Sequence, residues 1–206
     1  MSKLRIGALA SHEGTTLQAI LDACATGALD AGVVAVVSNN SDSGALRRAR
    51  AAGAAAVHLS SKTHPDAEQL DLAISDALTQ HGVEVVFLAG YMKKLGPALL
   101  GRFRGRILNT HPALLPKHGG HGMYGMRVHE AVLRAGDAES GPSVHLVEEE
   151  YDTGRVLAQA KVPVLADDTP ASLAARVQER ERKLVVSVLA DVASGALTLE
   201  GLPSRS

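Results

Sequence analysis

Short apolar runs alternate with segments of helical length along the first half of the chain, and no other feature constrains the fold as strongly. Buried strands are predicted at residues 4–10, 33–40, 54–59, 83–90 and 106–111. Helical patterns lie between the earlier runs. A repeated strand–helix–strand order indicates a parallel sheet with helices on both faces. The sequence therefore predicts an α/β protein with a Rossmann-like, open and mostly parallel sheet flanked by helices.

The helical segments carry recognisable start and stop residues. They are predicted at residues 15–27, 43–53, 65–80 and 167–195. Gly27 and Gly53 mark the ends of the first two, while Pro65 and Pro170 are expected in the first turns of the last two. Residues 143–164 predict two strands around a polar turn. The second half of the chain therefore departs from the regular alternation of the first.

Length and composition limit the kind of protein that the chain can be. At 206 residues, one domain spanning 1–206 is the simplest expectation. Hydrophobic residues make up 46% of the chain, but no apolar run is long enough to cross a bilayer. The opening MSKLRIGALA lacks the cleavage context of a signal peptide and is interpreted as a strand, so a cytoplasmic protein is expected. The last residues, 202–206, are expected to be disordered.

Charge and cysteine content exclude several classes of function. The formal net charge is −1, and the Lys and Arg residues are scattered, which argues against a nucleic-acid surface. The single cysteine, Cys24, excludes an intramolecular disulfide and a thiolate-rich zinc site. We therefore expect a soluble protein that acts on small molecules, with no nucleic-acid or membrane partner.

The turn after the first predicted strand, SHEGTT at residues 11–16, is the first candidate site. Ligands of open α/β sheets bind at the carboxyl ends of the strands, and the amides of a helix N-terminus attract phosphate. Gly14, Thr15 and Thr16 are therefore candidates for a phosphate cradle. A plain helix cap at Thr15 or Thr16 would explain the same residues. The turn has neither a G-x-G-x-x-G nor a Walker sequence, so no dinucleotide or ATP site is expected.

The end of the fifth predicted strand, ILNTHPALLP at residues 107–116, is the second candidate. Asn109 and His111 are two residues apart in an extended segment, so their side chains point to the same side. The Asn amide can donate to an oxyanion, and the imidazole can exchange a proton near neutral pH. The alternative is that Asn109 caps the next turn and His111 is a satisfied, partly buried imidazole. Local sequence leaves both open.

An acidic segment, EEEYDTG at residues 148–154, contains the third candidate. Its three glutamates fit a solvated turn. Asp152 differs because it precedes Thr-Gly where the chain turns into the next strand, so the backbone can fix its position. A carboxylate held close to His111 would favour the imidazolium and raise the His111 pKa.

A glycine-rich stretch, KHGGHGMYG at residues 117–125, is more typical of a mobile lid than of a fixed site. Its His118 and His121 could be combined with His111 and His129 as metal ligands. However, a flexible glycine loop holds ligands poorly, and neither cysteines nor an H-E-x-x-H pair supports such a site. We therefore expect no metal.

Taken together, these motifs resemble those of one enzyme family. The chain contains NTHPALLP, VHEAVLRAG, SGPSVHLV and YDTGRVLAQ, together with TLQAILDA, LAGYMKKL and SLAARVQERE, in the order and spacing of that family. It is similar over essentially its whole length to the folate-dependent glycinamide ribonucleotide formyltransferases of purine synthesis. Asn-x-His-Pro followed by Asp-x-Gly is shared by a wider formyltransferase superfamily, and the flanking motifs and the length narrow the match.

The resemblance implies a formyltransferase fold and a role for each motif. A formyl group would pass from 10-formyltetrahydrofolate to the amine of glycinamide ribonucleotide, through a tetrahedral intermediate stabilised by Asn109 and His111, with Asp152 raising the His111 pKa. The implied ribonucleotide site comprises Gly14, Thr15, Thr16, Gln178 and Glu181. The implied folate site comprises Met92, Lys93, Lys94, Leu95, Asn109, Glu148, Glu149, Glu150, Tyr151 and Asp152. No metal is implied, and the Leu115–Pro116 bond is expected to be cis.

Several positions depart from the family pattern. The first loop of the family usually reads Ser-Gly-x-Gly-Ser-Asn, whereas this chain has His12 in place of the first Gly and Thr16 in place of Asn. These changes affect side-chain contacts and loop conformation, although the backbone amides are retained. Lys93 replaces a more common Arg, which preserves charge but not the planar fork. Ala67 stands where some members carry a folate-contacting Arg.

Three rival functions remain to be weighed against formyl transfer. A formyltetrahydrofolate hydrolase would use water as the acceptor, although that family usually carries an N-terminal regulatory domain. A methionyl-tRNA formyltransferase would need an additional C-terminal domain and a basic RNA surface. A non-catalytic ligand-binding or metal-binding protein on the same scaffold is the third, and the joint presence of Asn109, His111 and Asp152 argues against it. The oligomeric state is left open, with a homodimer as one candidate.

Overall fold

The computed structural model describes residues 3–202, which divide into two compact units. The first unit comprises Met1–Leu108 with Leu189–Ser206, and the second comprises Asn109–Val188. One domain over 1–206 stays a prediction. The disorder expected for residues 202–206 falls, apart from Leu202, outside the described residues.

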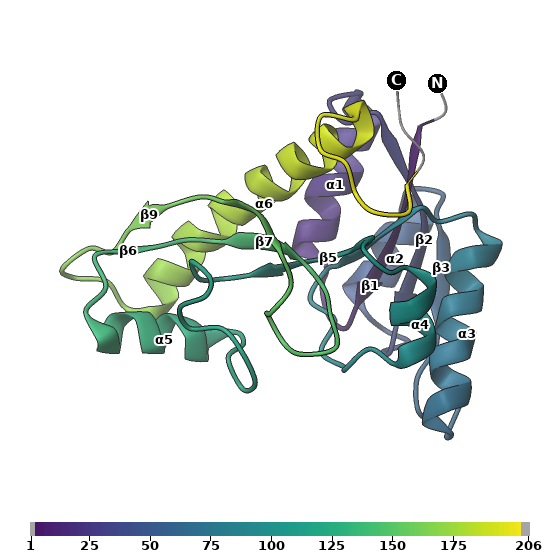
Figure 1. Cartoon of the computed structure of the whole chain (residues 1–206), viewed down its shortest axis with the longest axis horizontal. Coiled ribbons are helices and arrows are strands. Elements are labelled where there is room, and N and C mark those ends of the chain that lie inside the picture. Colours follow the sequence, from purple (N-terminus) through teal and green to yellow (C-terminus); the bar gives the residue numbers. More distant parts are fainter. Residues whose placement is uncertain (1–2, 203–206) are drawn as a thin grey trace. The chain divides into compact units, whose positions relative to one another are not determined.

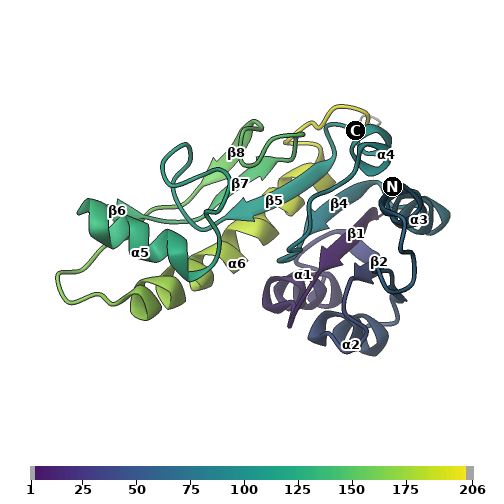
Figure 2. The same ribbon diagram turned by 90° about the horizontal axis from the view of Figure 1, so that it is seen from below.

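Parallel strands separated by helices build the first unit (Figure 1). Its elements are β1 (Leu4–Ala10), α1 (Thr15–Thr26), β2 (Ala31–Ser38), α2 (Gly44–Ala51), β3 (Ala55–His58), α3 (Ala67–Gln80), β4 (Val85–Leu88) and α4 (Pro97–Arg102). Strand β1 pairs in parallel with β2 and with β4, and β2 pairs in parallel with β3. Figure 2 shows α1 and α2 on one face of these strands and α3 on the other. The predicted strand–helix alternation is confirmed.

Strands β1 and β4 of this unit are buried on both faces, which explains their continuous apolar sequences. In β4 all of Val85–Leu88 is buried, and in β1 only Arg5 is exposed. At Gly7 of β1, a β-carbon would lie 2.8 Å from side-chain atoms of Leu78 and Val83. Helix α3 and the turn that follows it therefore approach β1 too closely for any larger residue at this position.

The ends of the helices follow their sequence signals with one correction. Gly27 and Gly53 both adopt positive φ, at 78° and 74°, as expected for residues that stop helices. The third helix begins two residues later than predicted, because the Asp66 side chain caps it by accepting a hydrogen bond from the Gln69 amide. Pro65 therefore precedes the cap and does not lie in the first turn.

The second unit contains shorter strands and two helical segments. Its elements are the end of β5 (Ile107–His111), α5 (Met126–Ala135), β6 (Glu139–Ser140), β7 (Ser143–Leu146), β8 (Val156–Gln159), β9 (Val162–Pro163) and most of α6 (Pro170–Ser194). Strands β7 and β8 are antiparallel, as are β6 and β9. Val132, Val162, Leu173 and Val177 form its buried cluster. The order of the seven-stranded sheet is β3-β2-β1-β4-β5-β7-β8.

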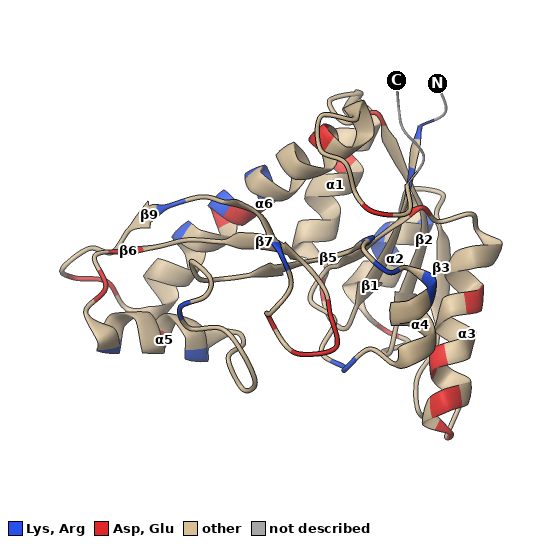
Figure 3. Ribbon diagram, in the orientation of Figure 1, with Lys and Arg blue, Asp and Glu red and all other residues tan. Residues whose placement is uncertain are grey.

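Charged residues are dispersed over the elements of both units. Figure 3 shows acidic residues along α3, and Lys and Arg distributed over several helices and loops. None of the described helices combines the length and the apolar sequence needed to cross a membrane.

Candidate functional site

The end of β5 places Asn109 and His111 next to two other residues of the second unit, Asp152 and His145. The His111 Nδ1 atom lies 3.3 Å from Asp152 Oδ2. Asn109 Nδ2 lies 3.2 Å from His145 Nε2, and the same Nε2 lies 3.4 Å from Asp152 Oδ1. The three predicted catalytic residues are thus linked through one further residue, His145. The alternative in which Asn109 only caps a turn does not explain these contacts.

Asp152 is held in place by backbone geometry and by several donors. It has a φ of 59°, which is uncommon for a residue other than glycine, and its Oδ2 accepts a 2.9 Å hydrogen bond from the Gly120 amide. Burial raises the pKa of Asp152, but the hydrogen bond from His145, the charge of His111 and the Gly120 amide together outweigh this effect. The Asp152 pKa therefore lies below its ordinary value, and the residue is a carboxylate at neutral pH.

Asp152 raises the His111 pKa as expected, but it is not the largest influence on this group. The His111 side chain is only 4% exposed, and burial lowers its pKa more than Asp152 and the His118 carbonyl raise it. The repulsion from His145 and His118 adds to the lowering. Sequence identified the neighbouring carboxylate but could not supply the depth of burial. His111 is therefore predominantly neutral at pH 7.

The first residues of the glycine-rich stretch contact His111 directly. The His118 carbonyl oxygen lies 2.7 Å from His111 Nε2, so this nitrogen carries the proton and donates it. His118 has a φ of 54°, and its own Nε2 lies 2.7 Å from Asp137 Oδ2. Lys117 Nζ lies 2.8 Å from the other Asp137 oxygen. Both partners lower the pKa of Asp137. The predicted mobile lid stays a prediction, while its start is anchored at Asp137.

The segment that follows His111 is braced by two polar side chains of the antiparallel pair β7 and β8. The Ser143 hydroxyl donates to the Ala113 carbonyl at 2.6 Å and accepts from the Leu115 amide at 3.0 Å. Gln159 Nε2 donates to the Leu115 carbonyl at 3.0 Å and to Ser143 Oγ at 2.8 Å. The bond between Leu115 and Pro116 is cis, which confirms the expectation.

Four residues of this site were not predicted as functional. They are His145, Ser143, Asp137 and Gln159. Ser143 and His145 are two residues apart in a strand, the same spacing that identified Asn109 and His111, so this pair carried a usable signal. The contact of Asp137 with His118 spans 19 positions and has no local signature.

The remaining residues of the acidic segment lie at the surface. Glu148, Glu149 and Glu150 are exposed, in agreement with a solvated turn, and Tyr151 is 44% exposed. The Tyr151 ring lies 5.8 Å from that of His121. Their predicted contacts with folate stay predictions.

The candidate phosphate cradle in the first unit has no capping side chain. Gly14, with a φ of 65°, is the N-cap of α1, and no side chain of the described residues hydrogen bonds to this cap. Arg48 fixes the loop by donating to the Glu13 carbonyl at 2.8 Å and to Gln18 at 2.6 Å. Gly14, and not Thr15 or Thr16, is therefore the N-cap of α1, and the phosphate cradle stays a prediction.

The other predicted binding residues are distributed between the two units. Met92, Lys93 and Lys94 are exposed in the first unit, whereas Leu95 is partly buried there. Gln178 and Glu181 lie on the part of α6 that belongs to the second unit. Among residues 3–202, no group of three or more His, Cys, Asp or Glu is arranged to hold a metal ion.

Known proteins match this chain over most of its length. The formyl transferase family model matches residues 4–189. The phosphoribosylglycinamide formyltransferase of Escherichia coli is 40% identical over 196 residues, which cover 95% of this chain and 90% of the relative. The chain belongs to the phosphoribosylglycinamide formyltransferase family. The chloroplastic phosphoribosylglycinamide formyltransferase of Arabidopsis thaliana is 43% identical over 186 residues, and the chain spans 64% of that relative.

Solved structures of the phosphoribosylglycinamide formyltransferase family share the fold. The glycinamide ribonucleotide transformylase 1 of Symbiobacterium toebii superposes with a TM-score of 0.89 at 38% identity, covering 97% of this chain and 92% of the other. The Rossmann-like, mostly parallel sheet flanked by helices is therefore that of the family, and the family resemblance read from the sequence motifs is confirmed.

Proposed function

We propose that the protein transfers a formyl group from 10-formyltetrahydrofolate to the amine of glycinamide ribonucleotide in purine biosynthesis. The observation that carries the proposal is the part-buried link from Asn109 through His145 and Asp152 to His111. It combines an amide donor, an imidazole donor and a carboxylate at one strand end, which are the groups that acyl transfer to an amine requires. The folate is consumed in the reaction and is therefore a second substrate.

The His118 carbonyl indicates how His111 meets the reacting oxygen. This carbonyl accepts a hydrogen bond from His111 Nε2 at 2.7 Å. We propose that the formyl oxygen replaces it as the acceptor, so that Nε2 of His111 and the amide of Asn109 donate to the oxyanion that forms when the amine attacks the formyl carbon. The negative charge that develops on this oxygen then favours protonation of His111. The carboxylate of Asp152 accepts a hydrogen bond from the Nδ1–H group of the resulting imidazolium.

One proton must move from the attacking amine to the folate nitrogen that leaves. The tetrahedral intermediate collapses by breaking the bond between the formyl carbon and that nitrogen, which gives formylated ribonucleotide and tetrahydrofolate. Asp152, or a water molecule bound to it, carries the proton, since it is the carboxylate nearest to His111. Bringing two substrates together contributes much of the acceleration. The ribonucleotide phosphate would lie at the amides of Gly14, Thr15 and Thr16, with Gln178 and Glu181 contacting the remainder.

The folate would contact Met92 to Leu95, Asn109 and the 148–152 segment, and no metal takes part in this scheme. A cytoplasmic location is part of the same proposal. The experiment follows tetrahydrofolate release with both substrates and then with 10-formyltetrahydrofolate alone. Release that requires the ribonucleotide supports transfer, whereas equal release without it would identify a hydrolase and refute the proposal.

A further inference from the structure

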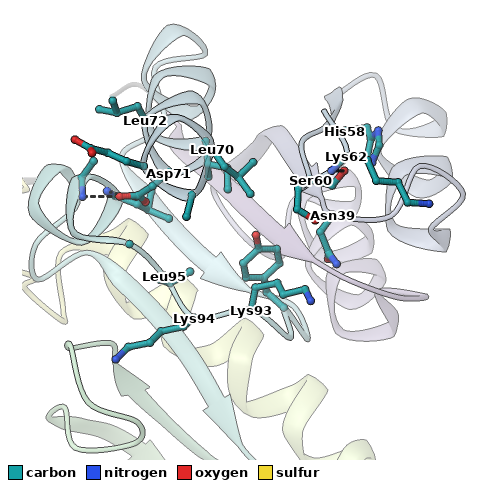
Figure 4. A pocket seen from close by; sticks show the side chains of 18 of the residues that line it. Asn39, His58, Ser60, Lys62, Leu70, Asp71, Leu72, Lys93, Lys94 and Leu95 are labelled. Carbon is teal, nitrogen blue, oxygen red and sulfur yellow. Dashed lines mark hydrogen bonds between the residues drawn. The ribbon is translucent and has the colours of Figure 1, made fainter. Parts of the chain in front are cut away.

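A cavity of about 720 Å³ in the first unit is lined by residues of the predicted folate site (Figure 4). They are residues 93–95, and part of α3 completes the wall. Under the proposed function this cavity therefore belongs to the folate. A cluster in the second unit, formed by Asp137, Lys117 and His118, has no role in that scheme and needs an explanation of its own.

Asp137 lies directly after α5, where the backbone is held to the end of this helix. Gly136 ends the helix with a φ of 68°, and its amide donates to the Leu133 carbonyl at 3.1 Å. The Asp137 amide donates to the Val132 carbonyl at 3.4 Å, and Val132 belongs to the buried cluster of this unit. The Asp137 carboxylate therefore has a fixed base from which it can hold a neighbouring segment.

Both oxygens of Asp137 are bound by successive residues of the glycine-rich stretch. Lys117 Nζ lies 2.8 Å from Oδ1, and His118 Nε2 lies 2.7 Å from Oδ2. Successive side chains of an extended segment point to opposite sides, but the positive φ of His118, 54°, turns the chain so that both reach one carboxylate. This φ is uncommon for a residue other than glycine, so the surrounding contacts must hold it.

The two contacts differ in their exposure to water. The side chains of His118 and Asp137 are 15% and 16% exposed, whereas that of Lys117 is 69% exposed. An exposed ion pair contributes little because water screens it, and a shielded, charge-assisted hydrogen bond contributes more. The His118 contact is therefore the one that we expect to fix the loop.

The main chain that follows this contact touches both catalytic side chains. The His118 carbonyl lies 2.7 Å from His111 Nε2, and the Gly120 amide donates to Asp152 Oδ2 at 2.9 Å. Between them, a β-carbon at Gly119 would lie only 3.4 Å from Asp152 Cβ, so the loop runs close against this carboxylate. A displacement of His118 would therefore change the contacts of both catalytic groups.

We propose that Asp137 is a positioning residue of the catalytic site. By holding the His118 side chain, it sets the His118 carbonyl on His111, which keeps the ring proton on Nε2 and the donor ready for the formyl oxygen. It also sets the Gly120 amide on Asp152. This inference rests on the proposed function, because it assigns the orientation of the imidazole to formyl transfer.

The first test observes the His111 ring in the free protein by NMR of the histidine ring nitrogens, above pH 7. In the wild type Nε2 should carry the proton. In Asp137→Ala the carbonyl is no longer held in place, so we expect the Asp152 carboxylate to draw the proton toward Nδ1. The control Glu139→Ala removes an acid that pairs with Lys161 at 2.8 Å in the same unit, and it should keep the wild-type tautomer.

The second test measures ribonucleotide-dependent formyl transfer. We expect kcat of Asp137→Ala to fall roughly 10- to 100-fold, the cost of a misplacement of about 1 Å, with an unchanged KM for the ribonucleotide. His118→Asn tolerates positive φ but is too short to reach Asp137, so it should reproduce the loss, and the double variant should be no worse than either single variant. Lys117→Gln should lower kcat by at most about fivefold, because its contact is exposed.

A second variant, Asp137→Asn, keeps the test decisive if Asp137→Ala does not fold. Its amide offers one acceptor oxygen, and its NH₂ group faces the other donor, so it should show part of both effects. Wild-type kcat or an unchanged Nε2 tautomer in the folded variant would overturn the inference. A loss of kcat that appears in Lys117→Gln but not in His118→Asn would assign the effect to the exposed pair, which also overturns it.

The two measurements separate this inference from the proposed function. The tautomer is observed without either substrate, so it tests the positioning of His111 whatever reaction the protein catalyses. Absence of transfer in the wild type would refute the proposed function alone. Transfer in the wild type together with an unchanged tautomer in the Asp137 variants would refute the inference alone.

Discussion

Replacing His145 by leucine removes the side chain that links Asn109 to Asp152. His145 is 2% exposed, and its Nδ1 lies 2.8 Å from the Leu146 carbonyl oxygen, which accepts the Nδ1 proton. The other ring nitrogen contacts Asn109 at 3.2 Å and Asp152 at 3.4 Å. Leucine fills much of the same volume but makes neither contact. We therefore expect turnover to fall because the Asn109 amide loses the group that orients it.

The size of this effect follows from one contact at a time, because Nε2 of His145 cannot accept from Asn109 and donate to Asp152 in the same protonation state. A part-buried neutral hydrogen bond such as that of Asn109 contributes about 1 kcal/mol. The contact with the Asp152 carboxylate is long, at 3.4 Å, so we take the lower end of the range for charged groups, about 1.5 kcal/mol. If the contact that is present is expressed in the transition state, kcat falls roughly 5- to 13-fold. The Gly120 amide and His111 still contact Asp152, so the fold should be retained.

The assay is ribonucleotide-dependent release of tetrahydrofolate, measured as a function of pH. The hydrogen bond from His145 is the largest of the effects that lower the Asp152 pKa. In His145→Leu the acid limb of the profile should therefore move to higher pH, which a purely structural defect would not cause. His145→Gln should retain part of the activity because its amide can still donate, and His81→Leu serves as a control. A kcat within twofold of wild type, with the acid limb unmoved, would refute the assigned role.

Three further predictions test other parts of the site. His111→Ala should lower kcat roughly 10²- to 10³-fold with an unchanged circular dichroism spectrum, and near-normal turnover would exclude it as an oxyanion donor. Gly14→Ala places a β-carbon 3.0 Å from Ala45 Cβ at a φ of 65°, so the KM for ribonucleotide should rise; Gly27→Ala, with positive φ but no neighbour within 4 Å, should leave it unchanged. Burial and the charge of His111 lower the pKa of His129. The imidazole of His129 therefore binds a proton more readily in the unfolded chain than in the folded one. The stability that results is fully present above the unfolded pKa of about 6.5 and is lost as the pH falls from there through the lower folded pKa. The free energy of unfolding, measured with urea at pH 7.5 and 5.5, should therefore fall less between these pH values in His129→Leu than in wild type. An equal fall in both proteins would contradict this prediction.

The first half of the fold was predictable because its central strands β1 and β4 are buried on both faces. Such strands have continuous apolar sequences, and β1, β3 and β4 fall within predicted runs, whereas β2 begins at Ala31, two residues before its predicted run. Helix α5 was missed because its N-cap is Gly125, with no capping side chain, after a stretch in which glycine is frequent. Strands β6 and β9 have only two residues each, too few to show any periodicity.

The site was predictable where one strand carried its residues. The spacing of Asn109 and His111 identified the pair from local sequence, whereas Asp152 needed the family pattern to connect it with them. The same spacing in β7 could have identified His145, but its contact with Asn109 joins residues 36 positions apart. The expected effect of Asp152 on the His111 pKa has the right direction, but the larger lowering by burial was not predicted, for a related reason. A sequence shows which charges exist, while the balance between burial and neighbouring charge depends on the packed structure.

The glycine-rich stretch contributes to the electrostatics of the site. It places the His118 carbonyl on one nitrogen of His111 and the Gly120 amide on the carboxylate that faces the other nitrogen. These positions need positive φ, at 54° for His118 and 96° for Gly120, so the conformation is specific to this loop. The carbonyl raises the His111 pKa and the amide lowers that of Asp152. Moving the loop would therefore change both members of the pair together, and a substrate oxygen that displaces the His118 carbonyl would take over its effect on His111.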